Sequence, residues 1–176
     1  MSDLRSLQQR LPLPIAPRGG AVGTMVTLSA TGLPPGERLL IAFANLQNYQ
    51  LVQRVETDAE GSFTTTQVVP PWALKDGVHY FFASYADEIP LALSAGFHVT
   101  AADGTARVEG TIGAASGGCL DLQDLGETLY HLTGDVGAHK AGDRVTVSGK
   151  IAGASLCGGS GITLEVTEIK PLPRFD

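Results

Sequence analysis

The sequence predicts an all-β protein built from two small modules in tandem, a β-sandwich followed by a five-stranded barrel. Its 22 glycines and 10 prolines separate short runs rich in Val, Thr, Leu, Ile and Phe, and no long stretch carries an apolar period of 3.6 residues. The 176 residues exceed the usual single-domain size of roughly 100 to 150 and fit two modules of about 80 residues each. A hydrophobic content of 43% against 17% charged residues excludes a disordered chain.

Residues 1–19 are expected to form an N-terminal arm. Leu4, Leu7 and Leu11 fall on one face at helical spacing, and three prolines between residues 12 and 17 then force an extended path. A helix this short is marginal alone, so something must hold the arm down. That surface belongs either to the same chain's sandwich or to a neighbouring subunit, and we favour the neighbour. The candidate partner-binding residues of the arm are Leu4, Leu7, Leu11, Leu13 and Ile15.

Residues 20–100 alternate apolar and polar side chains, which is the period of a β-strand. Six or seven short strands, with turn signals about every 8 to 12 residues, are typical of a β-sandwich. Two hairpins are expected, one turning at Asp58-Ala59-Glu60-Gly61 and one at Asp87-Glu88-Ile89-Pro90. The expected strands are 24–29, 38–44, 50–57, 61–69, 78–85 and 91–100.

Five segments of this module carry a resemblance through their order and spacing. They are Gly23-Thr24-Met25-Val26-Thr27-Leu28-Ser29, Gly32-Leu33-Pro34-Pro35-Gly36-Glu37, Thr57-Asp58-Ala59-Glu60-Gly61-Ser62-Phe63, Val69-Pro70-Pro71 and Phe97-His98-Val99-Thr100. Together they resemble the Ig-like repeats of bacterial surface proteins over about residues 17–100. The resemblance implies an Ig-like sandwich that serves as a spacer or an adhesive fold, with no family active site to carry over.

A second module is expected at residues 106–171, after a linker at 101–105 and before a tail at 172–176. Five strands with a longer connection after the third, at residues 134–142, follow the order of an OB-like barrel. The expected strands are 106–112, 119–125, 128–133, 144–151 and 162–169.

The second module also resembles a small secreted bacterial domain of unknown function over residues 106–170. The matching segments are Val108-Glu109-Gly110-Thr111, Leu129-Tyr130-His131-Leu132 and Gly142-Asp143-Arg144-Val145-Thr146-Val147-Ser148-Gly149, with a cysteine in each of two loop-strand regions. This resemblance implies no activity.

The two cysteines, Cys119 and Cys157, lack the short-range Cys or His partners that a zinc site needs. A disulfide between them is our prediction, and the alternative is two unpaired thiols in a reducing compartment. The disulfide closes a span of about 38 residues and contributes roughly 3 to 4 kcal/mol by the loop-entropy estimate.

Charge and hydropathy narrow the partners and the location. The formal charge is -6 and no run of Lys or Arg makes a basic face, which argues against nucleic acid and anionic membranes. No apolar stretch approaches the 18 or so residues of a membrane span, and residues 1–19 lack the apolar core of a signal peptide. We expect an extracytoplasmic protein, either secreted or at a cell or particle surface, whose export signal is not written in this chain.

Two groups of residues could hold a metal ion. His131, His139, Asp135 and Asp143 are suitable ligands for a transition metal, but their spacing is not diagnostic and we favour solvated loop residues as the interpretation. Asp121, Asp124 and Glu127 could bind calcium, but the regular Asp-x-Asp-x-Asp-Gly loop is absent and an acidic hairpin end is the simpler interpretation. We expect no metal and no cofactor.

The sequence does not indicate an enzyme. No Gly-x-Ser-x-Gly elbow occurs, and Cys157 has no nearby His but does have a partner in Cys119. Gly149-Lys150 is not a phosphate loop, because Arg144 stands at the position of the motif's first Gly and Ile151 at that of its Ser or Thr.

Two segments could bind a partner. Trp72 is either a recognition platform or a cap on the sandwich core, and we favour the cap. The segment 45–50 offers amides and a tyrosine at a loop tip, which give adaptable hydrogen bonding, although it could equally be a plain polar turn. The candidate binding residues there are Asn45, Gln47, Asn48 and Tyr49.

These observations favour a non-enzymatic structural or adhesive module that mediates protein-protein contact at a surface. One alternative is a subunit or decoration protein of a large assembly such as a virion, anchored by its N-terminal arm. Another is a carbohydrate- or ligand-binding accessory domain that uses the barrel face or the 45–50 loop.

Overall fold

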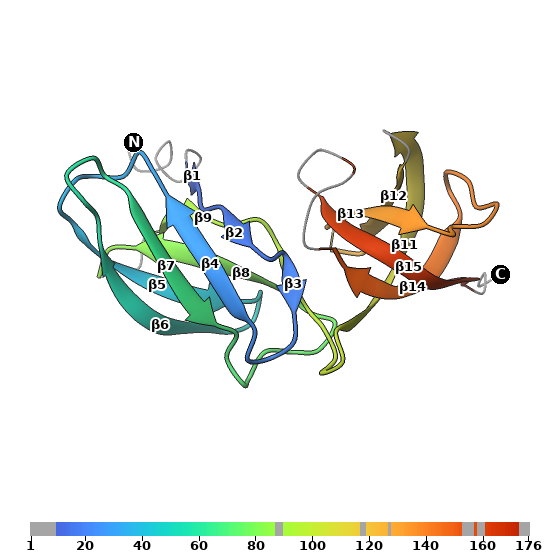
Figure 1. The fold of residues 1–176 in the computed structure, drawn as a ribbon, viewed down its shortest axis with the longest axis horizontal. Coiled ribbons are helices and arrows are strands. Elements are labelled where there is room, and N and C mark those ends of the chain that lie inside the picture. The colour runs from blue at the N-terminus through green and yellow to red at the C-terminus, as the bar shows by residue number, and fades with distance from the viewer. Residues whose placement is uncertain are drawn as a thin grey trace. The chain divides into compact units, whose positions relative to one another are not determined.

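A computed structural model describes residues 10–86, 90–116, 119–126, 128–152, 157 and 161–172. These residues form strands and no helix, in agreement with the predicted all-β class (Figure 1). The strands are β1 (Leu11–Pro12), β2 (Ile15–Ala16), β3 (Gly19–Gly20), β4 (Met25–Ala30), β5 (Arg38–Ala44), β6 (Tyr49–Glu56), β7 (Phe63–Val68), β8 (Val78–Ser84), β9 (Pro90–Leu93), β10 (Phe97–Val99), β11 (Thr105–Ser116), β12 (Cys119–Asp124), β13 (Leu129–Gly134), β14 (Arg144–Ile151) and β15 (Ile162–Pro171). Nowhere in the described ranges is there a helix long and apolar enough to cross a membrane.

The chain divides into two compact units. The first comprises residues 1–17, 22–73 and 78–97, and the second comprises residues 18–21, 74–77 and 98–176. Two short segments, 18–21 and 74–77, therefore belong to the second unit although the residues before and after them belong to the first.

The first unit contains two sheets. One has the order β2-β4-β7, and in the other β5 lies between β6 and β8, with β9 and then β1 following on the far side of β8 (Figure 1). In β4 the apolar residues Val26, Leu28 and Ala30 are buried and alternate with more exposed neighbours. The alternation places one face of each strand in the core. The core includes Val26, Leu28, Leu39, Ile41, Phe43, Phe81, Ala83 and Phe97.

The predicted hairpin between β6 and β7 is wrong. β6 pairs with β5, whereas β7 pairs with β4 in the other sheet, so the chain crosses between the sheets at residues 57–62. The turn itself forms as expected, because Asp58 Oδ1 accepts hydrogen bonds from the backbone N–H groups of Glu60 and Ser62. Gly61 has a φ of 77°, and a Cβ there would collide with the carbonyl oxygen of Leu33. The second predicted pairing, of β8 with β9, is confirmed.

One side chain joins the two sheets where β6 and β7 run past each other. Gln53 Nε2 donates to the Thr66 carbonyl oxygen at 2.8 Å and to Gln67 Oε1 at 2.9 Å, and Gln53 Oε1 accepts from Thr65 Oγ1 at 2.8 Å. Since these strands share no backbone ladder, the amide of Gln53 supplies hydrogen bonds between the two sheets.

The arm differs from its prediction from residue 11 onward. Leu11 lies in strand β1, not in a helix, and pairs in parallel with Ala92 of β9. Leu13 is 1% exposed and its N–H donates to the Leu93 carbonyl oxygen, while Ile15 pairs with Leu28 of β4. Leu13 is therefore covered by its own chain and not by a neighbour, because the prolines around it keep the backbone extended along two sheet edges. Leu4 and Leu7 lie outside the described residues.

The second unit contains the predicted five-stranded barrel. The strands close in the order β11-β12-β13-β15-β14, with β13 and β15 parallel and the other pairs antiparallel. The long strand β11 pairs with β14 through Thr105–Thr111 and with β12 through Gly110–Ser116. Alternate side chains fill the interior, which is made of Ala106, Val108, Ile112, Leu122, Tyr130, Leu132, Val145, Val147, Ile162 and Leu164.

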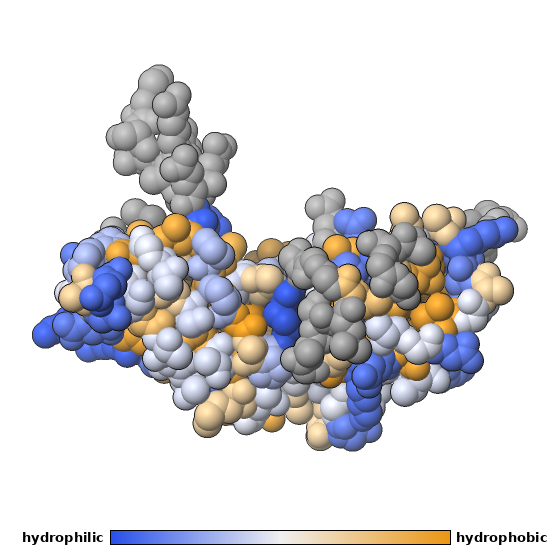
Figure 2. Space-filling model, turned by 45° about the horizontal axis from the view of Figure 1, so that its top comes forward, coloured by the Kyte–Doolittle hydropathy of each residue, from blue (hydrophilic) through white to orange (hydrophobic). Residues whose placement is uncertain are grey.

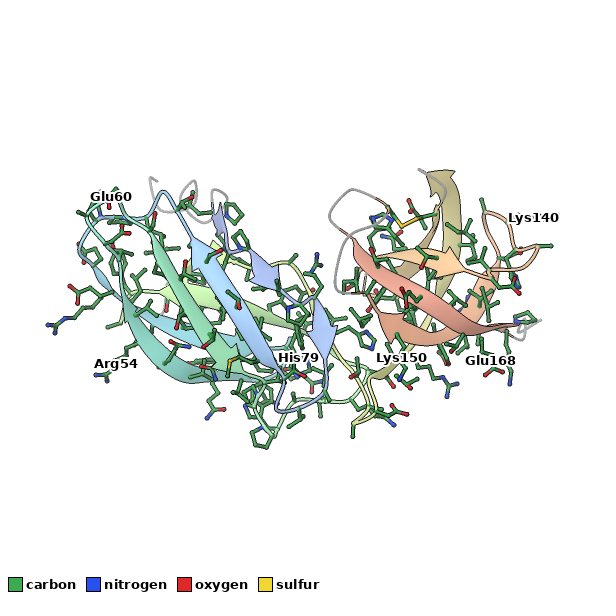
Figure 3. All side chains as sticks on the ribbon, in the orientation of Figure 1. Arg54, Glu60, His79, Lys140, Lys150 and Glu168 are labelled. Carbon is green, nitrogen blue, oxygen red and sulfur yellow. A yellow bond between two sulfur atoms is a disulfide. The ribbon has the colours of Figure 1, made fainter. Side chains whose placement is uncertain are left out.

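The predicted disulfide between Cys119 and Cys157 is confirmed (the yellow bond in Figure 3). Cys119 begins β12 and is buried, whereas Cys157 lies in the connection between β14 and β15. The two Cα atoms are 5.8 Å apart. The bond thus ties the β14–β15 connection to the outside of the barrel.

Candidate functional site

The loop between β5 and β6 is a tight turn held by Asn45. Asn45 Oδ1 accepts hydrogen bonds from the N–H groups of Gln47 at 2.9 Å and Asn48 at 2.8 Å, and the Asn45 N–H donates to the Asn48 carbonyl oxygen. The side chain of Asn45 therefore builds the turn. Leu46 lies at the tip of this turn, where its side chain is 99% exposed.

Three large apolar side chains gather on this hairpin and form what we call the hairpin surface: Leu46, Tyr49 and Leu51. Tyr49 and Leu51 are 53% and 41% exposed and lie on one face of β6, because strand residues two apart point the same way. The Tyr49 ring lies 6.4 Å from the ring of Phe82 on β8. Figure 2 shows hydrophobic side chains (orange) reaching the surface of the first unit among hydrophilic ones.

Sequence reasoning identified Tyr49 but missed Leu46 and Leu51. The signal for Leu51 was present, since Tyr49 and Leu51 alternate with the polar Gln50. The register shows which face they occupy: Tyr49 pairs with Ala44 and Leu51 with Ala42. These partners alternate with the buried Phe43, so the hairpin surface lies on the outer face of the sheet.

Trp72 packs against the core of the first unit, as the favoured interpretation expected. The centroid of its ring lies 5.3 Å from that of Phe43 and 5.8 Å from that of His79. The rings of Phe43 and His79 stack, with their centroids 4.9 Å apart. The indole N–H donates to Gln50 Oε1 at 2.6 Å. Trp72 is therefore engaged with the inner face of β6, opposite the hairpin surface.

In the second unit three side chains form a hydrogen-bonded chain. His98 Nδ1 lies 2.8 Å from the Tyr130 hydroxyl, and His98 Nε2 lies 3.1 Å from Asp76 Oδ1. A carboxylate only accepts, so Nε2 carries the proton and Nδ1 accepts from Tyr130. Burial lowers the pKa of His98 even though Asp76 acts in the opposite direction, which favours the neutral ring. Asp76 also accepts from the backbone N–H of Arg107 at 3.0 Å.

A pocket of about 310 Å³ lies beside this chain of hydrogen bonds, and Glu109, Asp124 and Leu125 complete much of its wall. The described lining residues include no serine, threonine or cysteine, and the Tyr130 hydroxyl already donates to His98. Asp76 has a φ of 60°, a conformation that its bonds to His98 and Arg107 hold in place. The arrangement positions the segment 74–77 and, among the described residues, places no nucleophile beside a base.

The four residues considered as transition-metal ligands make different contacts. His131 Nδ1 lies 2.8 Å from Asp121 Oδ1, whereas His139 lies 3.7 Å from Asp143 and Asp135 accepts from the Gly137 N–H. His131 is 6% exposed, and its Nε2 has no hydrogen-bond partner within the described part of the chain. No group of three metal-ligating side chains occurs among the described residues.

The acidic residues considered for calcium also have separate contacts. Asp121 bonds to His131, and Asp124 Oδ1 accepts from the N–H groups of Gly126 and Thr128, which forms the turn between β12 and β13. Glu127 lies outside the described residues. The two described carboxylates therefore fit the interpretation as a hairpin end.

Comparison with protein-family models, curated proteins and solved structures found no match to this chain.

Proposed function

We propose that this chain is a non-enzymatic structural or adhesive β protein that binds another protein through the hairpin surface. The observation that carries the proposal is the exposure of Leu46, Tyr49 and Leu51, at 99%, 53% and 41%, on one hairpin. Contiguous apolar side chains rimmed by polar ones are typical of protein interaction sites. Here Gln47 and Asn48 supply the polar rim beside them.

The energetics of this surface favour a protein ligand. A tyrosine flanked by aliphatic side chains resembles the anchors that dominate binding energies at interfaces. Complete burial of each leucine contributes about 1.5 to 3 kcal/mol. The turn held by Asn45 presents these side chains in a fixed backbone, which lowers the entropy lost on binding.

The strand pairing supports an Ig-like first unit and an OB-like second unit as the scaffold. In the first unit, β2-β4-β7 lies apart from the sheet of β6, β5, β8 and β9, with β1 parallel to β9. In the second unit, the five strands close with β13 and β15 as the parallel pair, and five-stranded closure is typical of OB-like barrels. Both scaffolds present loops and sheet faces to partners.

The disulfide supports action outside the reducing cytosol, either at a cell surface or in secreted form. The same hairpin surface also serves the alternative in which the chain is a subunit of a large assembly. In that alternative, Leu4 and Leu7 remain the proposed anchors of the arm.

The test replaces the hairpin surface with polar side chains of smaller size. We expect Leu46→Ser, Tyr49→Ser and Leu51→Thr together to abolish retention of partner proteins from a native surface extract and any self-association measured by sedimentation. The control is Met25→Ser with Val68→Thr, since Met25 and Val68 are 59% and 42% exposed on the other sheet of the same unit. Equal retention and equal sedimentation of the two variants would refute the proposal.

A further inference from the structure

The outer face of β5 and β6 carries a second feature, a pocket at the end of the hairpin away from its turn. The pocket has a volume of about 510 Å³ and is lined by Arg38, Leu39, Leu40, Arg54, Val55, Glu56 and Ala86. Figure 3 shows Arg54 projecting outward from β6. The pairing of β5 with β6 thus brings two guanidinium groups and apolar side chains together in one pocket, although Arg38 and Arg54 are 16 positions apart in the sequence.

The strand register places the two arginines on either side of an aliphatic floor. Arg38 pairs directly with Glu56, and Leu40 pairs directly with Arg54. Residues two apart on a strand share a face, and so do directly paired residues on neighbouring strands. Arg38, Leu40, Arg54 and Glu56 therefore project from the same side of the sheet.

In the described part of the chain the two guanidinium groups have no acidic partner. Among the described residues neither Arg38 nor Arg54 forms an ion pair, whereas Arg107 in the second unit lies 3.7 Å from Glu109. A guanidinium fork binds a carboxylate with two parallel hydrogen bonds. Leu40 between the forks favours a ligand whose carboxylate is carried on an apolar stem.

The pocket and the hairpin surface lie on one continuous face. The outer-face residues of β5 run from Ala44, opposite Tyr49, through Ala42, opposite Leu51, to Leu40, opposite Arg54. At about 3.3 Å per residue, the step from Ala44 to Leu40 covers roughly 13 Å. An extended segment of a partner that places apolar side chains on the hairpin surface would reach the pocket about four residues further on.

We propose that the pocket of Arg38 and Arg54 binds an acidic side chain of a protein partner, carried on an extended segment whose apolar side chains cover the hairpin surface. This inference rests on the proposed function and adds the chemical character of the partner. Glu56 stands beside the two arginines and repels the incoming carboxylate, so the site selects a single carboxylate with an apolar flank and not a densely charged polyanion.

The experiment uses the full-length chain and a fluorescent peptide with a single carboxylate, acetyl-Leu-Thr-Leu-Thr-Glu-Thr-Thr-amide, with a matched peptide that has Gln in place of Glu. Alternation puts its Leu and Glu side chains on one face, with the Glu four positions after the first Leu. We expect the Glu peptide to bind, the Gln peptide to bind at least about tenfold more weakly, and Arg38→Gln or Arg54→Gln to weaken the Glu peptide by about tenfold each.

Two controls sharpen the assignment. Glu56→Gln removes the repulsion and should tighten binding of the Glu peptide about threefold, while Arg107→Gln should leave it unchanged. Raising NaCl from about 0.05 M to about 0.5 M should weaken the Glu peptide and spare the Gln peptide, since salt screens exposed charges. Melting curves of all variants should match, because these side chains are at the surface.

The outcomes separate this inference from the proposed function. Equal binding of the two peptides, no binding of either, or full binding by Arg38→Gln with Arg54→Gln would overturn the pocket assignment. If both peptides bind equally and both are lost when the hairpin surface is made polar, the proposed function stands and the pocket assignment fails. If the arginine variants lose the Glu peptide while the polar hairpin variant keeps it, the pocket assignment stands and the hairpin surface is wrong.

Discussion

The two units of this chain stabilise their small β cores in different ways. The barrel closes through backbone pairing on every side and adds a covalent bond between Cys119 and Cys157. The sandwich leaves β6 and β7 unpaired with each other and joins them through the side chain of Gln53. The first unit therefore relies on polar side chains at the edges of its two sheets. The second relies on a cross-link and on the buried polar groups of Tyr130 and His98.

Breaking the disulfide should produce the largest effect and should affect only the second unit. The bond spans 38 residues, so its loss costs about 3 to 4 kcal/mol by the loop-entropy model. Calorimetry of the double variant Cys119→Ala with Cys157→Ala should show the melting transition of the second unit lowered and that of the first unchanged. Equal lowering of both transitions would show that the two units do not stabilise themselves independently.

Removing the imidazole of His98 should cause the second-largest loss of stability. His98→Leu removes two hydrogen bonds, one from the Tyr130 hydroxyl and one to the Asp76 carboxylate, and at about 0.5 to 1.5 kcal/mol for each bond the expected loss is about 1 to 3 kcal/mol. Denaturant unfolding should register this loss in the second unit. The matched variant Tyr130→Phe removes one bond of the chain and should cost less, so an equal or greater loss for Tyr130→Phe would contradict the assigned hydrogen-bond chain.

Removing the amide of Gln53 should cause the third-largest loss of stability, and only the first unit should be affected. Gln53→Ala deletes three hydrogen bonds, but their surroundings are partly exposed and water replaces much of their energy, so the expected loss is about 1 kcal/mol. Gln47→Ala in the hairpin turn is the control, since its side chain is exposed. A loss no greater than that of the control would mean that Gln53 does not hold the sheets together.

Acidification should give the smallest of these effects, again in the second unit. Burial lowers the pKa of His98 in the folded protein from its ordinary 6.5, so the unfolded chain binds more protons as the pH falls through that value. Stability contributed by the neutral ring is therefore present above pH 6.5 and is lost below it. Urea midpoints of the second unit measured across this range should fall with pH in the wild type and change less in His98→Leu.

The sequence alone predicted features set by local pattern and missed those set by distant partners. The barrel strands, the pairing of Cys119 with Cys157 and the packing of Trp72 followed from alternation, cysteine count and aromatic character. Leu13 was assigned to a neighbour because its apolar character shows a need for cover but not where the cover lies. The chain from Tyr130 through His98 to Asp76 joins residues 32 and 22 positions apart, which no local period reveals.

The candidate binding face was likewise predicted where local pattern sets it and missed where distant pairing sets it. Amides and an aromatic at a loop tip predicted a binding role for residues 45–50, and the structure shows that Asn45 supports the turn while Leu46 and Tyr49 are exposed. The pocket of Arg38 and Arg54 depends on the register between β5 and β6, which follows from the turn and from the irregularity between Ile41 and Ala42. That register could not be predicted from the residues alone.

Site-specific photo-crosslinking tests the central claim most directly. A photoreactive amino acid at position 46, at the tip of the hairpin surface, should give a discrete protein adduct in the native cell or particle. The same amino acid at position 25, which is also exposed but lies in β4 of the other sheet, should not give that adduct. The adduct at position 46 should vanish when Tyr49 and Leu51 are replaced by polar residues. Identical adducts from both positions, or none from position 46, would contradict binding through the hairpin surface.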